Sequence, residues 1–230
     1  MATVDRVRVR SGIKWMADFG AQLATQPRAM TTLAPYARHP MLSSWDAGEP
    51  WWNWGAVQYL EQNLPTSGIA FEWGSGASTL WLTSHGLQVT AIESEAAWAE
   101  RVAERCPTAK VLHMPGHATG TLRLEEPWIG DSQTPYFDDY VAAIDDAAPA
   151  SLDVVVIDGV CRAECARHVA PKLKPTGIVV LDDTHWDFIK PAEKAFAGWK
   201  TIHKSGFKRR CATVFETTFF HPPDRDDSLS

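Results

Sequence analysis

With 230 residues, the chain is long enough for one sizeable α/β domain and too short for two. Its net charge of −6 and the scattered positions of its 22 basic residues argue against a nucleic-acid backbone as the main partner. Because no apolar run approaches the roughly eighteen residues that span a bilayer, and the N-terminus lacks a signal-peptide core, we expect a cytoplasmic protein that acts on a small molecule and not at a membrane.

Residues 1–49 are predicted to form a helical extension that precedes the main domain, residues 50–221. Apolar residues at helical spacing between Ile13 and Leu23 indicate a helix, and prolines break the chain after it. Residues 222–230 are expected to be a frayed acidic tail.

Cysteine and tryptophan are the informative residue types of the composition. Four cysteines do not make a disulfide framework in a chain of this length, so we expect free thiols. Most of the eleven tryptophans should be core residues, but clustered ones also line pockets for aromatic ligands. Trp51, Trp52 and Trp54 form such a cluster, and we expect Trp51 or Trp54 near the mouth of a substrate pocket.

The stretch from residue 68 to 82 organises the main domain. An apolar run ends on Glu72, breaks at Gly74 and Gly76, and restarts with helix-forming residues, which predicts a strand, a tight turn and a helix. Such a turn lets a ligand approach the backbone closely, and the free N–H groups of the helix start favour an electron-rich partner.

A second carboxylate follows the next predicted strand, residues 89–92. This carboxylate, Glu93, stands where an acid can bind both hydroxyls of a ribose. Glu72 would repel a pyrophosphate, so the pattern favours a nucleoside ligand without phosphates over NAD.

The sequence Glu-Trp-Gly-Ser-Gly-Ala-Ser-Thr at 72–79 resembles motif I of the class I S-adenosylmethionine-dependent methyltransferases, and Glu93 stands at that family's ribose-binding position. The resemblance implies a Rossmann-like α/β fold, with a mostly parallel seven-stranded sheet, helices on both faces and an antiparallel C-terminal strand. It also implies that S-adenosylmethionine is the cofactor. The residues implied to bind it are Glu72, Gly74, Ser75, Gly76, Ser78, Thr79, Glu93, His117 and Asp158.

Carboxylates also end two further predicted strands. Residues 152–157 and 177–181 are continuous apolar runs, typical of strands buried on both faces of a parallel sheet, and they end on Asp158 and on Asp182 and Asp183. Neighbouring strands lie about 4.8 Å apart, so these acids would repel one another unless one were protonated or a cation lay between them. The sequence thus predicts an acidic cluster at the sheet edge where ligands bind.

This second pattern resembles the metal-dependent O-methyltransferases of the macrocin type. The resemblance implies that Asp158, Asp182 and Asp183 bind Mg²⁺, which would lower the pKa of an acceptor hydroxyl. His185 is the expected general base, and Asp158 is the other expected catalytic residue. The lysine that such enzymes place after the first metal-binding Asp is missing here. The alternative is that Asp158 caps a helix while Asp182 and Asp183 are loop acids.

Together these features predict methyl transfer from S-adenosylmethionine to a small-molecule acceptor, with oxygen as the expected acceptor atom and Mg²⁺ as a candidate second cofactor. The residues expected to contact the acceptor are Trp51, Trp54, Arg162 and His185. A metal-independent methyltransferase and a non-catalytic scaffold of the same fold remain alternatives. By analogy with small-molecule methyltransferases, the N-terminal extension would form a lid or the contact of a homodimer.

Overall fold

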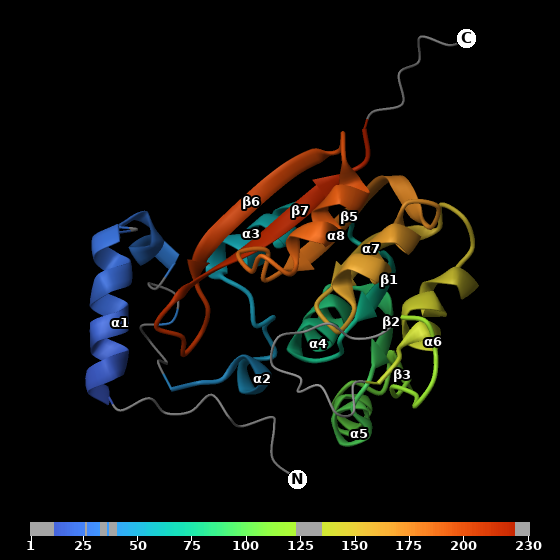
Figure 1. Cartoon of the computed structure of the whole chain (residues 1–230), viewed down its shortest axis with the longest axis horizontal. Helices are drawn as coiled ribbons and strands as arrows, with labels where there is room; N and C mark the ends of the chain where they lie inside the picture. Colours follow the sequence, from blue (N-terminus) through green and yellow to red (C-terminus); the bar gives the residue numbers. More distant parts are fainter. Residues whose placement is uncertain (1–11, 26, 33–35, 37–40, 123–134, 224–230) are drawn as a thin grey trace.

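The computed structural model describes residues 12–25, 27–32, 36, 41–122 and 135–223 (Figure 1). A seven-stranded sheet runs through it in the order β3-β2-β1-β4-β5-β7-β6. The strands from β3 to β5 are parallel to their neighbours, and β7 is antiparallel to both β5 and β6. The predicted mostly parallel sheet with an antiparallel C-terminal strand is therefore confirmed.

The four strands whose positions were predicted, β1, β2, β4 and β5, are all present. The seven strands are Gly68–Trp73 (β1), Leu87–Glu93 (β2), Lys110–His113 (β3), Leu152–Ile157 (β4), Leu173–Asp182 (β5), Lys200–Phe207 (β6) and Val214–His221 (β7). The predicted start of the fifth strand at residue 177 is wrong, because the ladder with β4 resumes at Leu173 across a register shift. That irregularity tolerates Pro175, which cannot donate to a regular ladder.

Helices cover both faces of the sheet. The α-helices are Gly12–Thr25 (α1), Ser44–Ala47 (α2), Trp54–Asn63 (α3), Ala77–Ser84 (α4), Ala96–Arg105 (α5), Asp138–Ala142 (α6), Arg162–Val169 (α7) and Lys190–Glu193 (α8). Short 3-10 helices span Pro27–Thr32 (η1), Ala143–Asp146 (η3) and Lys194–Phe196 (η4). No described helix has both the length and the apolar character needed to cross a membrane.

The core is divided by the sheet into two layers. Val155 and Ile157 of β4 point into the layer beneath α6, α7 and α8, while Val154 and Val156 point into the layer beneath α3 and α4. Because side chains alternate along a strand, a run that is apolar at every position can fill both layers. This placement of the strands brings the carboxyl ends of β1, β2, β4 and β5 to one edge of the sheet.

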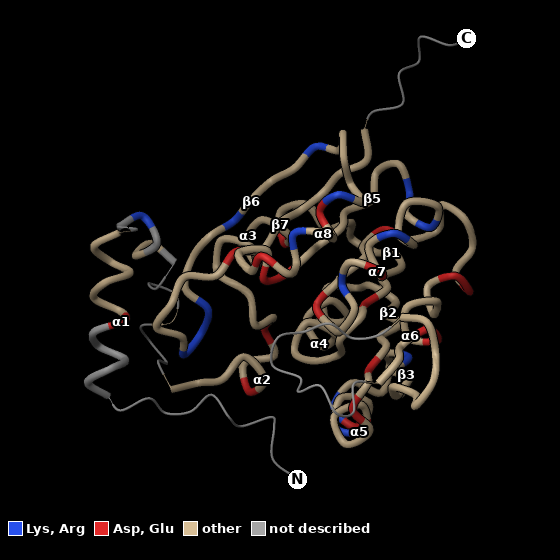
Figure 2. Tube along the Cα trace, in the orientation of Figure 1, with Lys and Arg blue, Asp and Glu red and all other residues tan. Residues whose placement is uncertain are grey.

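The predicted N-terminal helix is present as α1 and lies to one side of the sheet, next to η1 and the hairpin of β6 and β7 (Figure 1). Its Phe19 packs against Phe207 at the end of β6, with ring centroids 5.2 Å apart. Basic and acidic residues are scattered along the trace of the described elements (Figure 2), in keeping with the scattered charges of the sequence.

Candidate functional site

The glycine turn after β1 lies directly against the loop after β4. Gly74 has a φ of 89°, and a Cβ added to it would lie 2.8 Å from the backbone of Asp158 and Gly159. Its N–H donates to the carbonyl of Ile92 at 2.8 Å, which ties the turn to the end of β2. A side chain at this position would both strain the backbone and push these loops apart.

Glu72 is fully buried at the end of β1. Its Oε2 accepts a hydrogen bond from the Thr79 hydroxyl at 2.5 Å, and that hydroxyl accepts one from the Gly76 N–H at 2.9 Å. Its Oε1 is buried without a hydrogen-bond partner. Burial raises the pKa of Glu72 to about 8, although the nearby side chains of Ser78 and Thr79 act in the opposite direction. A buried carboxyl oxygen with no donor is uncommon and is suited to a donor that a ligand supplies.

Glu93 is held by backbone donors at the end of β2. Its Oε2 accepts from the Ser75 N–H and hydroxyl at 3.1 and 3.0 Å, and its Oε1 accepts from the N–H groups of Ser94 and Glu95 at 2.8 and 3.0 Å. Burial raises the pKa of Glu93 in spite of these bonds. A ribose hydroxyl could replace the Ser75 hydroxyl, which is free to rotate.

An aromatic pair that we did not predict covers the turn. The indole N–H of Trp98 donates to the carbonyl of Ser75 at 2.7 Å, and Trp45 of α2 packs on Trp98 with ring centroids 4.9 Å apart. Arg101 lies over both rings, and Arg105 donates to the carbonyl of Trp45. These contacts attach α2 to the candidate cofactor turn.

The three predicted metal ligands come together at the ends of β4 and β5. Oxygen atoms of Asp158, Asp182 and Asp183 all lie within 4.8 Å of one another. Two cations of the chain itself lie among them. The ammonium of Lys208 is 2.6 Å from both Asp182 and Asp183, and the guanidinium of Arg162 is 3.2 Å from Asp158 and 3.5 Å from Asp183.

The charges of this cluster shift the pKa values of its members. Burial lowers the pKa of Lys208, but Asp182 and Asp183 outweigh it and the pKa is raised, so the ammonium stays charged. Burial raises the pKa of Asp183, but Lys208 and Arg162 outweigh it and the pKa is lowered. Burial also raises the pKa of Asp158, because Arg162 offsets it only in part.

The donor set does not fit Mg²⁺ while Lys208 is in place. A magnesium ion needs oxygen ligands in a near-octahedral shell, whereas the space between Asp182 and Asp183 holds a buried ammonium 2.6 Å from each. The sequence predicted that a cation must lie between these acids unless one of them is protonated. Lys208, which sequence reasoning missed, supplies that cation. The basic triplet Lys208, Arg209 and Arg210, between the last two strands of an acidic chain, was the available signal.

Aromatic side chains surround the outer side of the acidic cluster. Trp51 is 44% exposed, and its ring and that of Phe215 lie 5.2 and 4.7 Å from the ammonium of Lys208. His185 packs on Phe215 and on Trp186, with ring centroids 5.0 Å apart in each case. Burial lowers the pKa of His185, which keeps the imidazole neutral and able to accept a proton at neutral pH.

Two further expected site residues, Trp54 and His117, contact residues outside the turn and the acidic cluster. Trp54 packs edge-to-face on Tyr36 and against the core layer beneath α3. His117 pairs with Asp139 at 3.2 Å, and its backbone bonds to Tyr136. Trp52, which we did not select, is fully buried and donates from its indole N–H to Asp158 at 3.2 Å.

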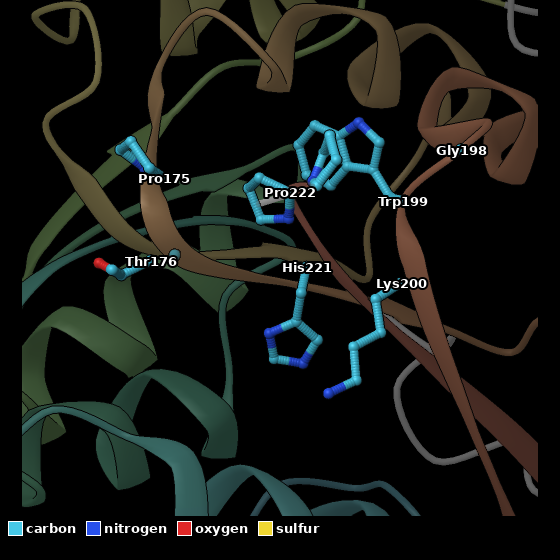
Figure 3. Close-up of a pocket in the computed structure, with 9 residues that line it drawn as sticks. Pro175, Thr176, Gly198, Trp199, Lys200, His221 and Pro222 are labelled. Carbon is cyan, nitrogen blue, oxygen red and sulfur yellow. The ribbon is translucent and has the colours of Figure 1, made fainter. Parts of the chain in front are cut away.

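A separate cavity of about 520 Å³ opens at the opposite edge of the sheet (Figure 3). Its lining includes Pro175 near the start of β5, Lys200 at the start of β6 and His221 at the end of β7. In parallel sheets, ligands bind beyond the carboxyl ends of the strands, so this cavity is distinct from the site described above.

No protein-family model matches the sequence, and no curated protein matches it. Solved structures do match. The chain is similar to the 1,6-didemethyltoxoflavin-N1-methyltransferase of Burkholderia thailandensis, solved with bound 1,6-didemethyltoxoflavin and S-adenosylhomocysteine. The TM-score is 0.50 at 10% identity, over 92% of this chain and 90% of that chain.

Two further structures show weaker similarity. The O-methyltransferase TomG of Streptomyces achromogenes, solved in complex with SAM, matches with a TM-score of 0.48 at 20% identity, over 74% of this chain and 79% of that chain. Precorrin-6y C5,15-methyltransferase of Geobacter metallireducens matches with a TM-score of 0.47 at 15% identity, over 74% and 88%. From the sheet order and the match to the Burkholderia enzyme, the chain has the Rossmann-like fold of the class I S-adenosylmethionine-dependent methyltransferases.

Proposed function

We propose that this chain binds S-adenosylmethionine and transfers its methyl group to an oxygen of a small-molecule acceptor. The observation that carries the proposal is the pair of buried acids on either side of the glycine turn. Glu72 has one oxygen without a donor, and Glu93 fixes the backbone of the turn through Ser75. A ligand with both a ribose and a positively charged group would be complementary to these two carboxylates.

Three residues in and beside the turn have roles in this proposal. Glu93 holds the ribose hydroxyls, and Oε1 of Glu72 receives a hydrogen bond from the charged amino acid part of the ligand. Gly74 keeps the turn close to the loop after β4, where Asp158 lies. S-adenosylmethionine supplies a methyl group on a sulfonium, which an aligned oxygen nucleophile can accept.

The acceptor is proposed to lie beside the aromatic side chains around the acidic cluster. Trp51 and Phe215 offer ring surface, Arg162 offers a guanidinium that can orient a polar group, and neutral His185 can accept the proton of the acceptor hydroxyl. We favour the metal-independent form of the reaction over the Mg²⁺-assisted one, because Lys208 already lies between the carboxylates. Residues 50–221 would carry the reaction, with residues 1–49 as a lid or dimer contact in a cytoplasmic enzyme.

Isothermal titration calorimetry tests the proposal directly. S-adenosylmethionine and S-adenosylhomocysteine should bind at micromolar concentration, and NAD should give no heat of binding. Glu93→Ala should weaken binding at least about tenfold, because it removes the acceptor for the ribose, which corresponds to about 1.4 kcal/mol.

Glu95→Ala is the matched control, since Glu95 adjoins the site but its side chain makes no capping bond and is exposed. It should bind like the wild type. No heat with S-adenosylmethionine would leave the non-catalytic scaffold as the better interpretation, and unchanged binding by Glu93→Ala would place the ligand elsewhere.

A further inference from the structure

Lys208 is the most deeply buried cation of the described chain. It follows β6 directly and is 1% exposed. Its ammonium makes two hydrogen bonds of 2.6 Å, one to Oδ2 of Asp182 and one to Oδ1 of Asp183. A lysine is seldom fully buried unless its charge is paired. The question is therefore why the chain places a paired lysine at this position.

The acids around Lys208 are arranged as ligands of one shared cation. Asp182 lies in the last position of β5, and its second oxygen accepts from the Thr217 hydroxyl of neighbouring β7 at 2.7 Å. Asp158 accepts from the indole of Trp52 at 3.2 Å and from Arg162. The carboxylates of Asp182 and Asp158 are thus each oriented by a donor of their own, Thr217 and Trp52.

The backbone next to the cluster shows that its shape is maintained against strain. Asp183 has a φ of 59° and Cys161, in the loop after β4, has a φ of 53°. Non-glycine residues reach this left-handed region at a cost and remain there when surrounding contacts fix them. Lys208 and Arg162 both pair with Asp183, so these cations are the contacts that hold the loop after β5 in its conformation.

We propose that Lys208 is a built-in substitute for a divalent cation: its ammonium takes the position between Asp182 and Asp183 that an ion would otherwise occupy and fixes the loops that carry Asp158 and Asp183. Lys208 is then a positioning residue, because it acts through the carboxylates and is itself sealed from the acceptor. One consequence rests on the proposed function, namely that methyl transfer needs no added metal. The other concerns the chain alone: without Lys208, the three acids should become a binding site for a divalent ion.

The test is a titration of Mn²⁺ into wild type, Lys208→Met and Lys204→Met. Binding is measured by isothermal titration calorimetry, and the melting temperature of each protein is measured with and without Mn²⁺. Methionine keeps much of the length of lysine without the charge. Wild type should bind no Mn²⁺ at this cluster at millimolar concentration. Lys208→Met should bind Mn²⁺ at least tenfold below that millimolar limit and melt at a higher temperature when Mn²⁺ is present.

Lys204→Met is the matched control, because Lys204 lies on β6, just before Lys208 in the chain, but its ammonium rests over Tyr59 and not among the acids. It should behave like the wild type. Adding Asp182→Asn to Lys208→Met should abolish the Mn²⁺ binding. If Lys208→Met alone fails to fold, the Lys208→Met, Asp182→Asn double variant, which removes one charge of each sign, should fold again.

Two results would overturn the proposal. One is Mn²⁺ binding by the wild type that is lost in Asp182→Asn, which would mean that an ion displaces Lys208. The other is a folded Lys208→Met variant that binds no Mn²⁺ at millimolar concentration. Neither result depends on S-adenosylmethionine, so a failure of cofactor binding would overturn the proposed function and leave this inference standing.

Discussion

Glu72 and Lys208 are both buried and ionisable, but the chain compensates their charges differently. Lys208 contacts two carboxylates, so its charged form is favoured. Glu72 has the hydroxyl of Thr79 as a donor, an oxygen without a partner and the negative charges of Asp158 and Glu93 nearby. Its neutral form is therefore the stable one at neutral pH before a ligand arrives.

This difference predicts how stability depends on pH. The pKa of Glu72 is about 8 in the folded chain against an ordinary value of 4.5, so between these pH values the folded state retains a proton that the unfolded state has lost. The free energy of unfolding should then fall as pH rises through this window, by at most about 1.4 kcal/mol per pH unit. Glu72→Gln removes this titration, so its stability relative to the wild type should increase steadily from pH 5 to pH 8 in urea unfolding experiments.

Glu95→Gln is the control for this series, because it removes an exposed carboxyl next to the same site. Its stability relative to wild type should stay constant over the same range. A constant difference between Glu72→Gln and the wild type would contradict the prediction, since it would show that Glu72 is already ionised in the folded chain at pH 5.

At the scale of elements, the glycine turn depends on backbone geometry more than on any side chain. Gly74 has a φ of 89°, and a Cβ there would lie 2.8 Å from backbone atoms of the loop after β4. Gly48, the C-cap of α2, has a φ of 66° but open space around the position of a Cβ. Comparing the two glycines therefore separates two free-energy costs of adding a Cβ: that of the left-handed backbone conformation and that of the steric contact with the loop after β4.

Replacing each glycine by alanine should lower the free energy of unfolding by unequal amounts. Gly48→Ala should lower the free energy of unfolding by about 1 kcal/mol, the usual cost of placing alanine in a left-handed conformation. Gly74→Ala carries the same cost plus displacement of the loop that bears Asp158, so we expect about 3 kcal/mol in total. Urea unfolding measures both, and equal losses would show that the loop after β4 moves aside freely.

The helices and strands were predictable because their sequence signals are local. The missed site residues were unpredictable, because their partners are distant in sequence. Apolar runs located β4, and the glycines after Glu72 located the turn between β1 and α4. The pairing of Lys208 with Asp182 arises only because β7 lies beside β5 and β6 beside β7, an order of strands that no periodicity encodes. The same reason explains why Trp52 was missed, since its partner Asp158 lies 106 residues further along the chain.

At the scale of the whole molecule, the N-terminal segments are joined to the hairpin that closes the sheet. Arg209, next to Lys208, pairs with Glu49 at 2.5 Å, and its guanidinium lies 4.6 Å above the ring of Tyr36. The indole N–H of Trp51 donates to the carbonyl of Arg209 at 3.1 Å. Tyr36, Glu49 and Trp51 therefore help to hold the connection between β6 and β7, the segment that contains Lys208.

This connection predicts that Glu49 and Arg209 are energetically coupled. In a double-mutant cycle of Glu49→Gln and Arg209→Met, we expect a coupling energy of about 1 kcal/mol, because Arg209 is buried while Glu49 is 34% exposed and is partly screened by solvent. The exposed pair of Glu164 and Arg167 on α7 is the control and should couple by less than about 0.5 kcal/mol.

Hydrogen exchange should show which segments lose stability when the pair of Glu49 and Arg209 is broken. Arg209→Met should speed exchange at residues 49–53 and 207–211 and leave the amides of β1 and β4 protected, because those strands are buried on both faces of the sheet. Faster exchange that spread uniformly through the sheet would mean that Arg209 stabilises the fold as a whole. Exchange unchanged near Glu49 would mean that the N-terminal segments are held by their other contacts, such as the packing of Trp45 on Trp98.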